Sequence, residues 1–127
     1  MISRKVTLTI NDANVALDKK IVVCKGDKGV VFNINLKTNV YNIGDEIVKA
    51  RAIVQDPSGN AEATAVVDIV DNVFALNLDD IWADGIDEAG KFLVQLQLFG
   101  ATPADAGITI QAFQFEVLEP IAEVPLS

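Results

Sequence analysis

The residues best equipped for chemistry are five carboxylates close together in the second half of the chain. They are Asp79, Asp80, Asp84, Asp87 and Glu88. Clustered carboxylate oxygens are what Ca²⁺ binds, but an EF-hand loop starting at Asp80 would have Trp82 at a ligand position and Lys91 in place of the bidentate glutamate. A glycosidase needs two carboxylates at a fixed separation, which neighbours in one loop rarely provide. We therefore favour a solvated acidic loop over a calcium site or a catalytic pair.

Nucleophilic catalysis has one candidate, Cys24, which lies beside Lys25 and Lys28. Neighbouring cations favour the reactive thiolate, but a nucleophile also needs a base, and the chain contains no histidine. The absence of histidine also removes the usual zinc ligand. We predict a structural cysteine at a strand end, a protein that is not an enzyme, no catalytic or metal-binding residues and no cofactor.

The segment Lys25-Gly26-Asp27-Lys28-Gly29 has the glycines and lysines of a phosphate-binding loop. It lacks the Walker spacing, however, and leads into a strand instead of a helix. We predict a tight turn in which Gly26 and Gly29 relieve backbone strain and Asp27 caps its own backbone.

Composition describes the domain that must position these residues. The chain has 127 residues, of which 50% are hydrophobic and 22% charged, which fits one domain with its own core. The formal charge of -8 argues against binding to nucleic acid, where phosphate neutralisation supplies most of the affinity. The N-terminal residues lack the continuous apolar stretch of a signal peptide, and no apolar run approaches the roughly 20 residues that span a bilayer. No membrane partner is expected.

Alternation of apolar and polar residues is the clearest structural signal, and it is typical of strands with one buried face. It predicts strands in residues 5–10, 30–37, 47–55, 62–69, 91–98 and 108–118. Residues 47–70 form a predicted hairpin, because Pro57 fixes φ in the turn and Gly59 accepts a positive φ. Short strands with turns between them and no long amphipathic helix predict an all-β fold, an antiparallel immunoglobulin-like β-sandwich of about seven or eight strands.

Four details of this sandwich are also predicted. The return arm of the hairpin buries Ala63, Ala65, Val67 and Ile69, and the last strand has a bulge near Gln111 or Ala112, where its apolar residues change phase. A short helical turn is expected at residues 78–82. The side chains predicted to share the core between the sheets are Phe32, Phe92, Val94, Leu96 and Phe115.

The domain boundary is predicted at residue 119. Residues 1–119 form the sandwich, and residues 120–127, which contain two prolines and no clear apolar face, form a linker or tail.

Charge is distributed unevenly along the chain. Residues 1–51 hold nine basic and five acidic side chains, whereas residues 52–127 hold one basic and thirteen acidic. Complementary fields orient partners before contact. We hypothesise a basic rim that docks onto an acidic neighbour, which another copy of the chain could supply. The residues of this rim are Arg4, Lys5, Lys19, Lys20, Lys25 and Lys28.

The order of these features resembles the N-terminal domain of phage upper baseplate proteins. An alternating strand is followed by the turn at residues 25–29, the strand at 30–36, the turn at 56–59, the strand at 90–98 and the last strand at 113–119. The resemblance covers residues 3–119. It implies a virion structural protein of a tailed phage or prophage that infects Gram-positive bacteria, with a β domain that anchors host-recognition modules to the tail hub or distal tail protein.

The same resemblance implies a location in the tail baseplate, after folding in the host cytoplasm. It also implies baseplate or distal tail proteins as partners and self-association, a trimer being one form in a full-length protein. The alternative is an immunoglobulin-like carbohydrate-binding or adhesion module, in which Trp82 would be a stacking platform for sugar. Sugar sites usually present several aromatic residues, and this chain has only Trp82, Tyr41 and six phenylalanines that mostly fall on predicted core faces.

Overall fold

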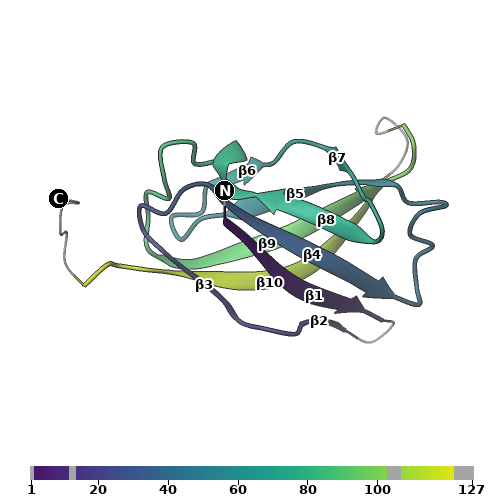
Figure 1. The fold of residues 1–127 in the computed structure, drawn as a ribbon, viewed down its shortest axis with the longest axis horizontal. Helices are drawn as coiled ribbons and strands as arrows, with labels where there is room; N and C mark the ends of the chain where they lie inside the picture. Colours follow the sequence, from purple (N-terminus) through teal and green to yellow (C-terminus); the bar gives the residue numbers. More distant parts are fainter. Residues whose placement is uncertain (1, 12–13, 103–106, 122–127) are drawn as a thin grey trace.

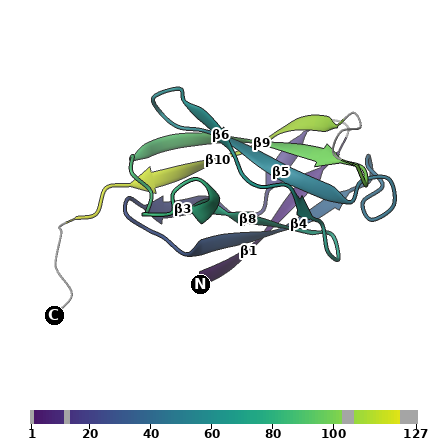
Figure 2. The same cartoon turned by 90° about the horizontal axis from the view of Figure 1, so that it is seen from above.

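The chain folds into two packed β-sheets in a computed structural model that describes residues 2–11, 14–102 and 107–121. Figure 2 shows the two layers from above, and Figure 1 shows them face on. The elements of the described residues are β1 (Ile2–Ile10), β2 (Val15–Leu17), β3 (Ile21–Cys24), β4 (Val30–Thr38), β5 (Lys49–Gln55), β6 (Ala61–Ala63), β7 (Val67–Asp68), β8 (Val73–Asn77), the 3₁₀ helix η1 (Leu78–Asp80), β9 (Gly90–Phe99) and β10 (Ile108–Leu118). The predicted all-β sandwich is confirmed.

The sheets contain four and six strands, and two of the pairings are parallel. The smaller sheet has the order β2-β1-β4-β8, and the larger has the order β3-β10-β9-β5-β6, with β7 also paired to β5. We expected antiparallel pairing throughout, but β1 pairs with β4 and β3 pairs with β10 in parallel. The reason is that the chain crosses from β2 to β3 in the other sheet before it returns as β4 beside β1. Several of the ten strands are only two to four residues long, which explains the smaller number predicted.

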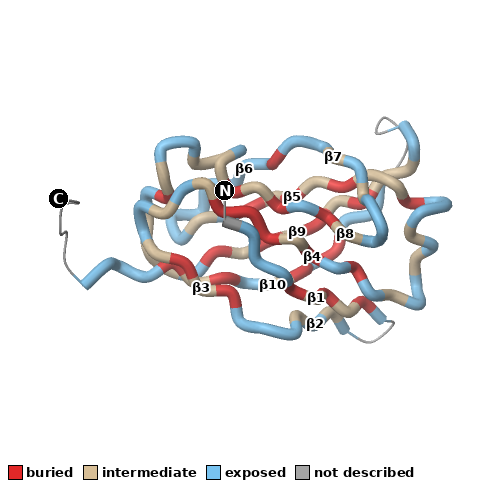
Figure 3. The backbone as a smooth tube through the Cα atoms, viewed as in Figure 1, coloured by how far each residue is buried: buried red, intermediate tan, exposed pale blue. Residues whose placement is uncertain are grey.

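The core lies between the two sheets, where the inward side chains of the long strands meet (Figure 3). All five residues predicted to share it are buried, with exposed fractions of 2% or less: Phe32, Phe92, Val94, Leu96 and Phe115. Phe92 and Phe115 stack with 5.0 Å between ring centroids. The alternation of the long strands therefore identified the correct inward faces.

The bulge predicted in the last strand is confirmed. The register between β10 and β9 shifts between Gln111 and Phe113, so Ala112 is the extra residue. Ile110 and Ala112 are buried before the shift, and Phe115 is buried after it. One inserted residue thus keeps both halves of the strand facing the core.

The return arm of the predicted hairpin differs from the expectation. Both β6 and β7 pair with β5, but Ala63 and Ala65 are exposed and Thr64 is buried. The Thr64 backbone N–H donates to the Ala52 carbonyl at 2.9 Å, and the Thr64 hydroxyl accepts from the Ala52 N–H at 3.0 Å. The prediction that these alanines point inward was wrong, because Thr64 turns inward to complete the hydrogen bonds of β5.

A second hairpin, which alternation did not predict, leads into β8. Val70 and Val73 bond to each other on either side of Asp71 and Asn72, whose φ angles are +51° and +63°. Two successive positive φ angles are the signature of a type I′ turn. After β8, η1 forms within the predicted helical turn, with the Asn77 side chain accepting from the Asp79 N–H.

At its end the chain leaves the sandwich. β10 ends at Leu118, next to the predicted boundary at residue 119, and residues 119–121 continue away from the sheets (Figure 1). Residues 122–127 of the predicted linker lie outside the described residues. Within the described part of the chain there is no helix of the length and apolar character that crossing a membrane requires.

Candidate functional site

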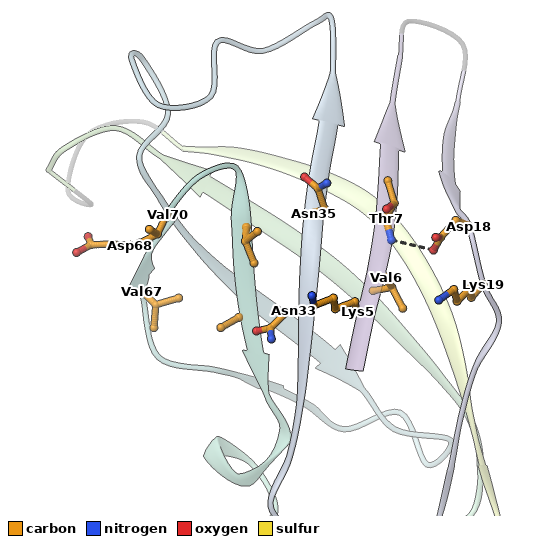
Figure 4. Close-up of a pocket in the computed structure, with 12 residues that line it drawn as sticks. Lys5, Val6, Thr7, Asp18, Lys19, Asn33, Asn35, Val67, Asp68 and Val70 are labelled. Carbon is orange, nitrogen blue, oxygen red and sulfur yellow. Dashed lines mark hydrogen bonds between the residues drawn. The ribbon is translucent and has the colours of Figure 1, made fainter. Parts of the chain in front are cut away.

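A depression on the outer face of the four-stranded sheet forms a trough of about 690 Å³ (Figure 4). Its floor is a grid of outward-facing positions from three strands. Lys5 and Thr7 of β1 lie beside Asn33 and Asn35 of β4, which in turn lie beside Ala75 and Val73 of β8. One wall is the segment around Val67 and Val70, and the other is the β2–β3 connection with Asp18 and Lys19. The volume falls within the range of about 300–1,000 Å³ that is common for binding pockets.

Alternation explains why this floor is polar. Over the part of β1 and β4 that forms the floor, the even-numbered residues Val6, Leu8, Ile34 and Leu36 point into the core, so their odd-numbered neighbours face outward. The wall on the side of β8 exists because the type I′ turn at residues 70–73 brings the chain back from the edge of the larger sheet.

Two of the six basic-rim residues line the trough. Lys5 and Lys19 are both exposed, and neither has an ion-pair partner among the described residues. The two acidic residues of the trough are already engaged, since Asp18 accepts from the Thr7 N–H at 2.8 Å and Asp68 pairs with Lys49 at 2.6 Å. Lys49 balances the charge of Asp68, but Asp18 keeps its charge because the Thr7 N–H is neutral, so Lys5, Lys19 and Lys49 exceed the two carboxylates by one positive charge.

The other basic-rim residues lie elsewhere. Lys20 pairs with Glu116 at 3.0 Å, and Lys25 pairs with Glu119 at 3.6 Å, both at the β3 edge of the larger sheet. Arg4 donates to the Val22 carbonyl at 2.8 Å and lies over the Phe32 ring. Lys28 is exposed in the turn before β4. The structure brings Lys5 and Lys19 together and holds Arg4, Lys20 and Lys25 in contacts within the chain.

The five clustered carboxylates do not converge on one point. Asp79 accepts from the Gly29 N–H with both oxygens, at 2.9 and 3.1 Å, and Asp80 accepts from the Ala65 N–H at 3.2 Å. Glu88 accepts from the Ser58 hydroxyl at 2.7 Å. Three of these side chains thus fasten different loops, and within the described residues no group of three or more acidic or cysteine side chains is placed to hold a metal ion.

The turn at residues 25–29 is held by a neighbouring loop. The Asp27 carboxylate accepts from the Cys24 N–H at 2.9 Å, and Gly26 and Gly29 have φ angles of +94° and +70°. The Gly26 N–H donates to the Ile86 carbonyl at 2.7 Å, and the Ile86 N–H donates to the Asp27 carbonyl at 3.0 Å. No helix follows this turn, because it leads directly into β4.

The turn at residues 56–60 closes the β5–β6 hairpin. Gly59 has a φ of +93°, and its N–H donates to the Asp56 carbonyl at 3.0 Å. Pro57 packs against the start of β9, where a Cβ on Gly90 would lie 2.7 Å from the proline ring.

Trp82 and Cys24 serve the packing of the domain. Trp82 is half-buried and meets Phe92 edge-on, with ring centroids 5.3 Å apart, and Phe115 at 6.5 Å. Trp82 thus packs at the margin of the core. Cys24 is half-buried at the end of β3, where it pairs with Leu118.

Sequence reasoning identified the two lysines of the trough but missed its amides and its aliphatic wall. Asn33 and Asn35 are the signal that was available, because asparagine is depleted in strands and here occupies two successive outward positions. The wall at Val67 and Val70 could not be predicted, because it depends on where the chain crosses between sheets.

Comparison with known proteins finds similarity among solved structures. No protein-family model matches the sequence, and no curated protein matches it. Among solved structures, the chain is similar to the N-terminal domain of phage TP901-1 ORF48, with a TM-score of 0.58 and 9% sequence identity. The match covers 91% of this chain and 98% of that chain. The resemblance to the N-terminal domain of a phage baseplate protein, predicted from the sequence, is thus confirmed as a shared fold with little sequence in common.

Proposed function

We propose that this chain is the anchoring domain of a virion structural protein of a tailed phage or prophage. In this role it attaches a baseplate protein, and the host-recognition modules which that protein carries, to the tail hub or distal tail protein. Its location is the tail baseplate, and its partners are baseplate or distal tail proteins together with further copies of the full-length protein.

The observation that carries this proposal is the extent of the fold similarity. The sandwich matches 98% of the N-terminal domain of phage TP901-1 ORF48, so the whole of that domain has its counterpart here. The order of turns and strands in the sequence supports the same assignment independently of the coordinates. A shared fold alone permits many functions, and for this reason the assignment is a proposal that needs a binding experiment.

The surface chemistry supports a role in protein contacts in preference to catalysis. Three of the five clustered carboxylates accept hydrogen bonds from loop backbone or hydroxyl groups, and Cys24 has no histidine to activate it. The trough offers positive charge, free amides and aliphatic side chains, which are the groups that recognise polypeptide.

The competing function is binding of carbohydrate by an immunoglobulin-like module. A sugar site built on aromatic stacking has little support in the trough, because its lining among the described residues includes no aromatic side chain. Charge likewise disfavours nucleic acid as a partner, since the chain carries a formal charge of -8.

Mass photometry tests the proposal. The chain is mixed at low micromolar concentration with the tail hub protein and with the distal tail protein of the same phage, and an unrelated acidic β-sandwich serves as the control. We expect a defined complex with one of the tail proteins and none with the control. Binding on a glycan array, together with no complex with any tail protein, would replace the proposal with the carbohydrate-binding alternative.

A further inference from the structure

The floor of the trough presents two side-chain amides with unused hydrogen-bonding groups. Neither Asn33 nor Asn35 has a side-chain hydrogen bond to any part of the chain that the structure describes. Each amide can donate two hydrogen bonds and accept two. Both face outward from the middle of β4, flanked by β1 on one side and β8 on the other.

The spacing of these amides matches that of an extended polypeptide. Residues two apart on one face of a strand are separated by about 6.8 Å, and peptide groups on one side of any extended chain repeat at the same distance. A segment lying along β4 can therefore offer an N–H and a carbonyl to each asparagine in turn. An apolar ligand or a compact sugar has no such repeat.

The charge of the trough selects the side chains of this segment. Lys49 compensates Asp68, and the charge of Asp18 offsets only one of the two remaining lysines, so Lys5 and Lys19 together leave one positive charge in excess. Figure 4 shows Lys19 reaching from the β2–β3 connection toward β1, and Lys5 reaching from β1 toward Asn33 of β4. Acidic side chains on the segment would meet these lysines on either side of β1.

The opposite side of the trough is aliphatic. Val70 is 63% exposed although it is a large hydrophobic residue, and Val67, Val73 and Ala75 continue the apolar surface beside it. Branched side chains of this kind bury well against an aliphatic residue of a partner. A segment with acidic residues toward β1 and aliphatic residues toward β8 is complementary to both sides.

We propose that the trough binds an extended segment of a partner protein in which acidic and aliphatic residues alternate. Asn33 and Asn35 hold its backbone, Lys5 and Lys19 pair with its carboxylates, and Val67 and Val70 cover its aliphatic side chains. This inference rests on the proposed function for the identity of the partner, a tail protein of the same virion, while the chemistry of the trough is tested separately.

The test uses a synthetic peptide with this pattern, acetyl-(Glu-Val)₄-amide, added to the ¹⁵N-labelled chain in a nuclear magnetic resonance titration. The side-chain NH₂ signals of Asn33 and Asn35 report directly on contact. We expect them to shift together with the backbone signals of β1, β4 and β8, and we expect acetyl-(Lys-Val)₄-amide to shift none of them. The shifts should shrink as added salt shortens the Debye length to about 8 Å and below.

Two variants separate the contributions. Lys19→Glu should weaken binding of the acidic peptide about five-fold, whereas Lys91→Glu, the same change on the outer face of the other sheet, should leave it unaltered. The double change Asn33→Leu and Asn35→Leu keeps the branched shape and the number of heavy atoms but removes the amides, and it should abolish binding while the rest of the spectrum stays native.

Several results would overturn the inference. These are no shifts with the acidic peptide, shifts centred on the six-stranded sheet, or equal binding of the basic peptide. Trough signals that change on dilution of the chain alone would assign the trough to a second copy instead. If Lys19→Glu and the double asparagine variant bind a tail protein as tightly as the unchanged chain does, the trough inference fails and the proposed function stands. If the peptide binds the trough but no tail protein binds the chain, the proposed function fails and the trough chemistry stands.

Discussion

A substitution at Gly85 should destabilise the domain far more than the same substitution at Gly59. Both residues have a positive φ, +103° and +93°, which costs an L-residue about 1–2 kcal/mol. The surroundings differ, because a Cβ on Gly85 would lie 2.7 Å from the carbonyl oxygen of Gly26, whereas a Cβ on Gly59 meets nothing within 4 Å. Gly59→Ala is therefore a matched control, because its loss of stability reflects only the cost of holding alanine at a positive φ.

The additional cost at Gly85 follows from the contacts that must move. Two backbone hydrogen bonds join the loops in this region. The Gly26 N–H donates to the Ile86 carbonyl, and the Ile86 N–H donates to the Asp27 carbonyl. Relieving the clash separates these two loops and weakens both bonds, each of which contributes about 1 kcal/mol net. Gly85→Ala should therefore lose about 3–4 kcal/mol, against about 1–2 kcal/mol for Gly59→Ala.

Urea unfolding followed by circular dichroism measures this difference. With a denaturant slope of about 2 kcal/mol/M, the midpoint for Gly85→Ala should lie about 1 M below that for Gly59→Ala. Equal midpoints for the two variants would refute the reasoning, because they would show that the loops at residues 26 and 85 do not meet as described.

Three further substitutions test the core, the acidic loop and the edge of the larger sheet. Phe92→Ala should cost about 3–5 kcal/mol, and a near-native thermal melting temperature would contradict its burial. Asp79→Ala should lower the free energy of unfolding by about 1–3 kcal/mol, because it removes the acceptor of a backbone N–H, whereas Asp84→Ala should leave that free energy nearly unchanged. Calorimetry of the native chain with 1 mM Ca²⁺, roughly the affinity of extracellular sites, should show no stabilisation. Thr64→Val should cost about 1–3 kcal/mol because it leaves the Ala52 N–H without its partner, and faster hydrogen exchange of that N–H is the accompanying sign.

The long strands were predictable from the sequence because their alternation reflects one buried face. Phe32, Phe92 and Phe115 fall on the inward positions that a period of two assigns, and the phase change in the last strand identified the bulge at Ala112. These features depend on neighbours along the chain, which a single sequence displays directly.

Pairing and edges were not predictable in the same way. The parallel register of β1 with β4 depends on a crossing between sheets at residues 18–20, and nothing local in those residues specifies it. Thr64 is buried although the alternation of the return arm predicts an exposed residue there. Its hydroxyl accepts from the Ala52 N–H of β5, and this requirement comes from a neighbouring strand. The short strand β8 had a usable signal in Asp71 and Asn72, two residue types that tolerate positive φ.

The candidate site was likewise predictable only in part. The positive balance of the first 51 residues led to the hypothesis of a six-residue basic rim, and of its members only Lys5 and Lys19 line the trough. The acidic partners that neutralise Lys20 and Lys25 come from β10 and from the residue that follows it, almost a hundred residues later in the chain. Such pairings emerge only when β3 and β10 are placed side by side.

Immunogold electron microscopy of purified virions tests the central claim most directly. Antibodies against the chain are applied to phage particles from the source of this sequence, with particles of an unrelated phage as the control. If the chain is a baseplate anchoring domain, gold should label the distal end of the tail and should be absent from the capsid. Unlabelled virions, with the protein recovered only from the host cell, would contradict the account.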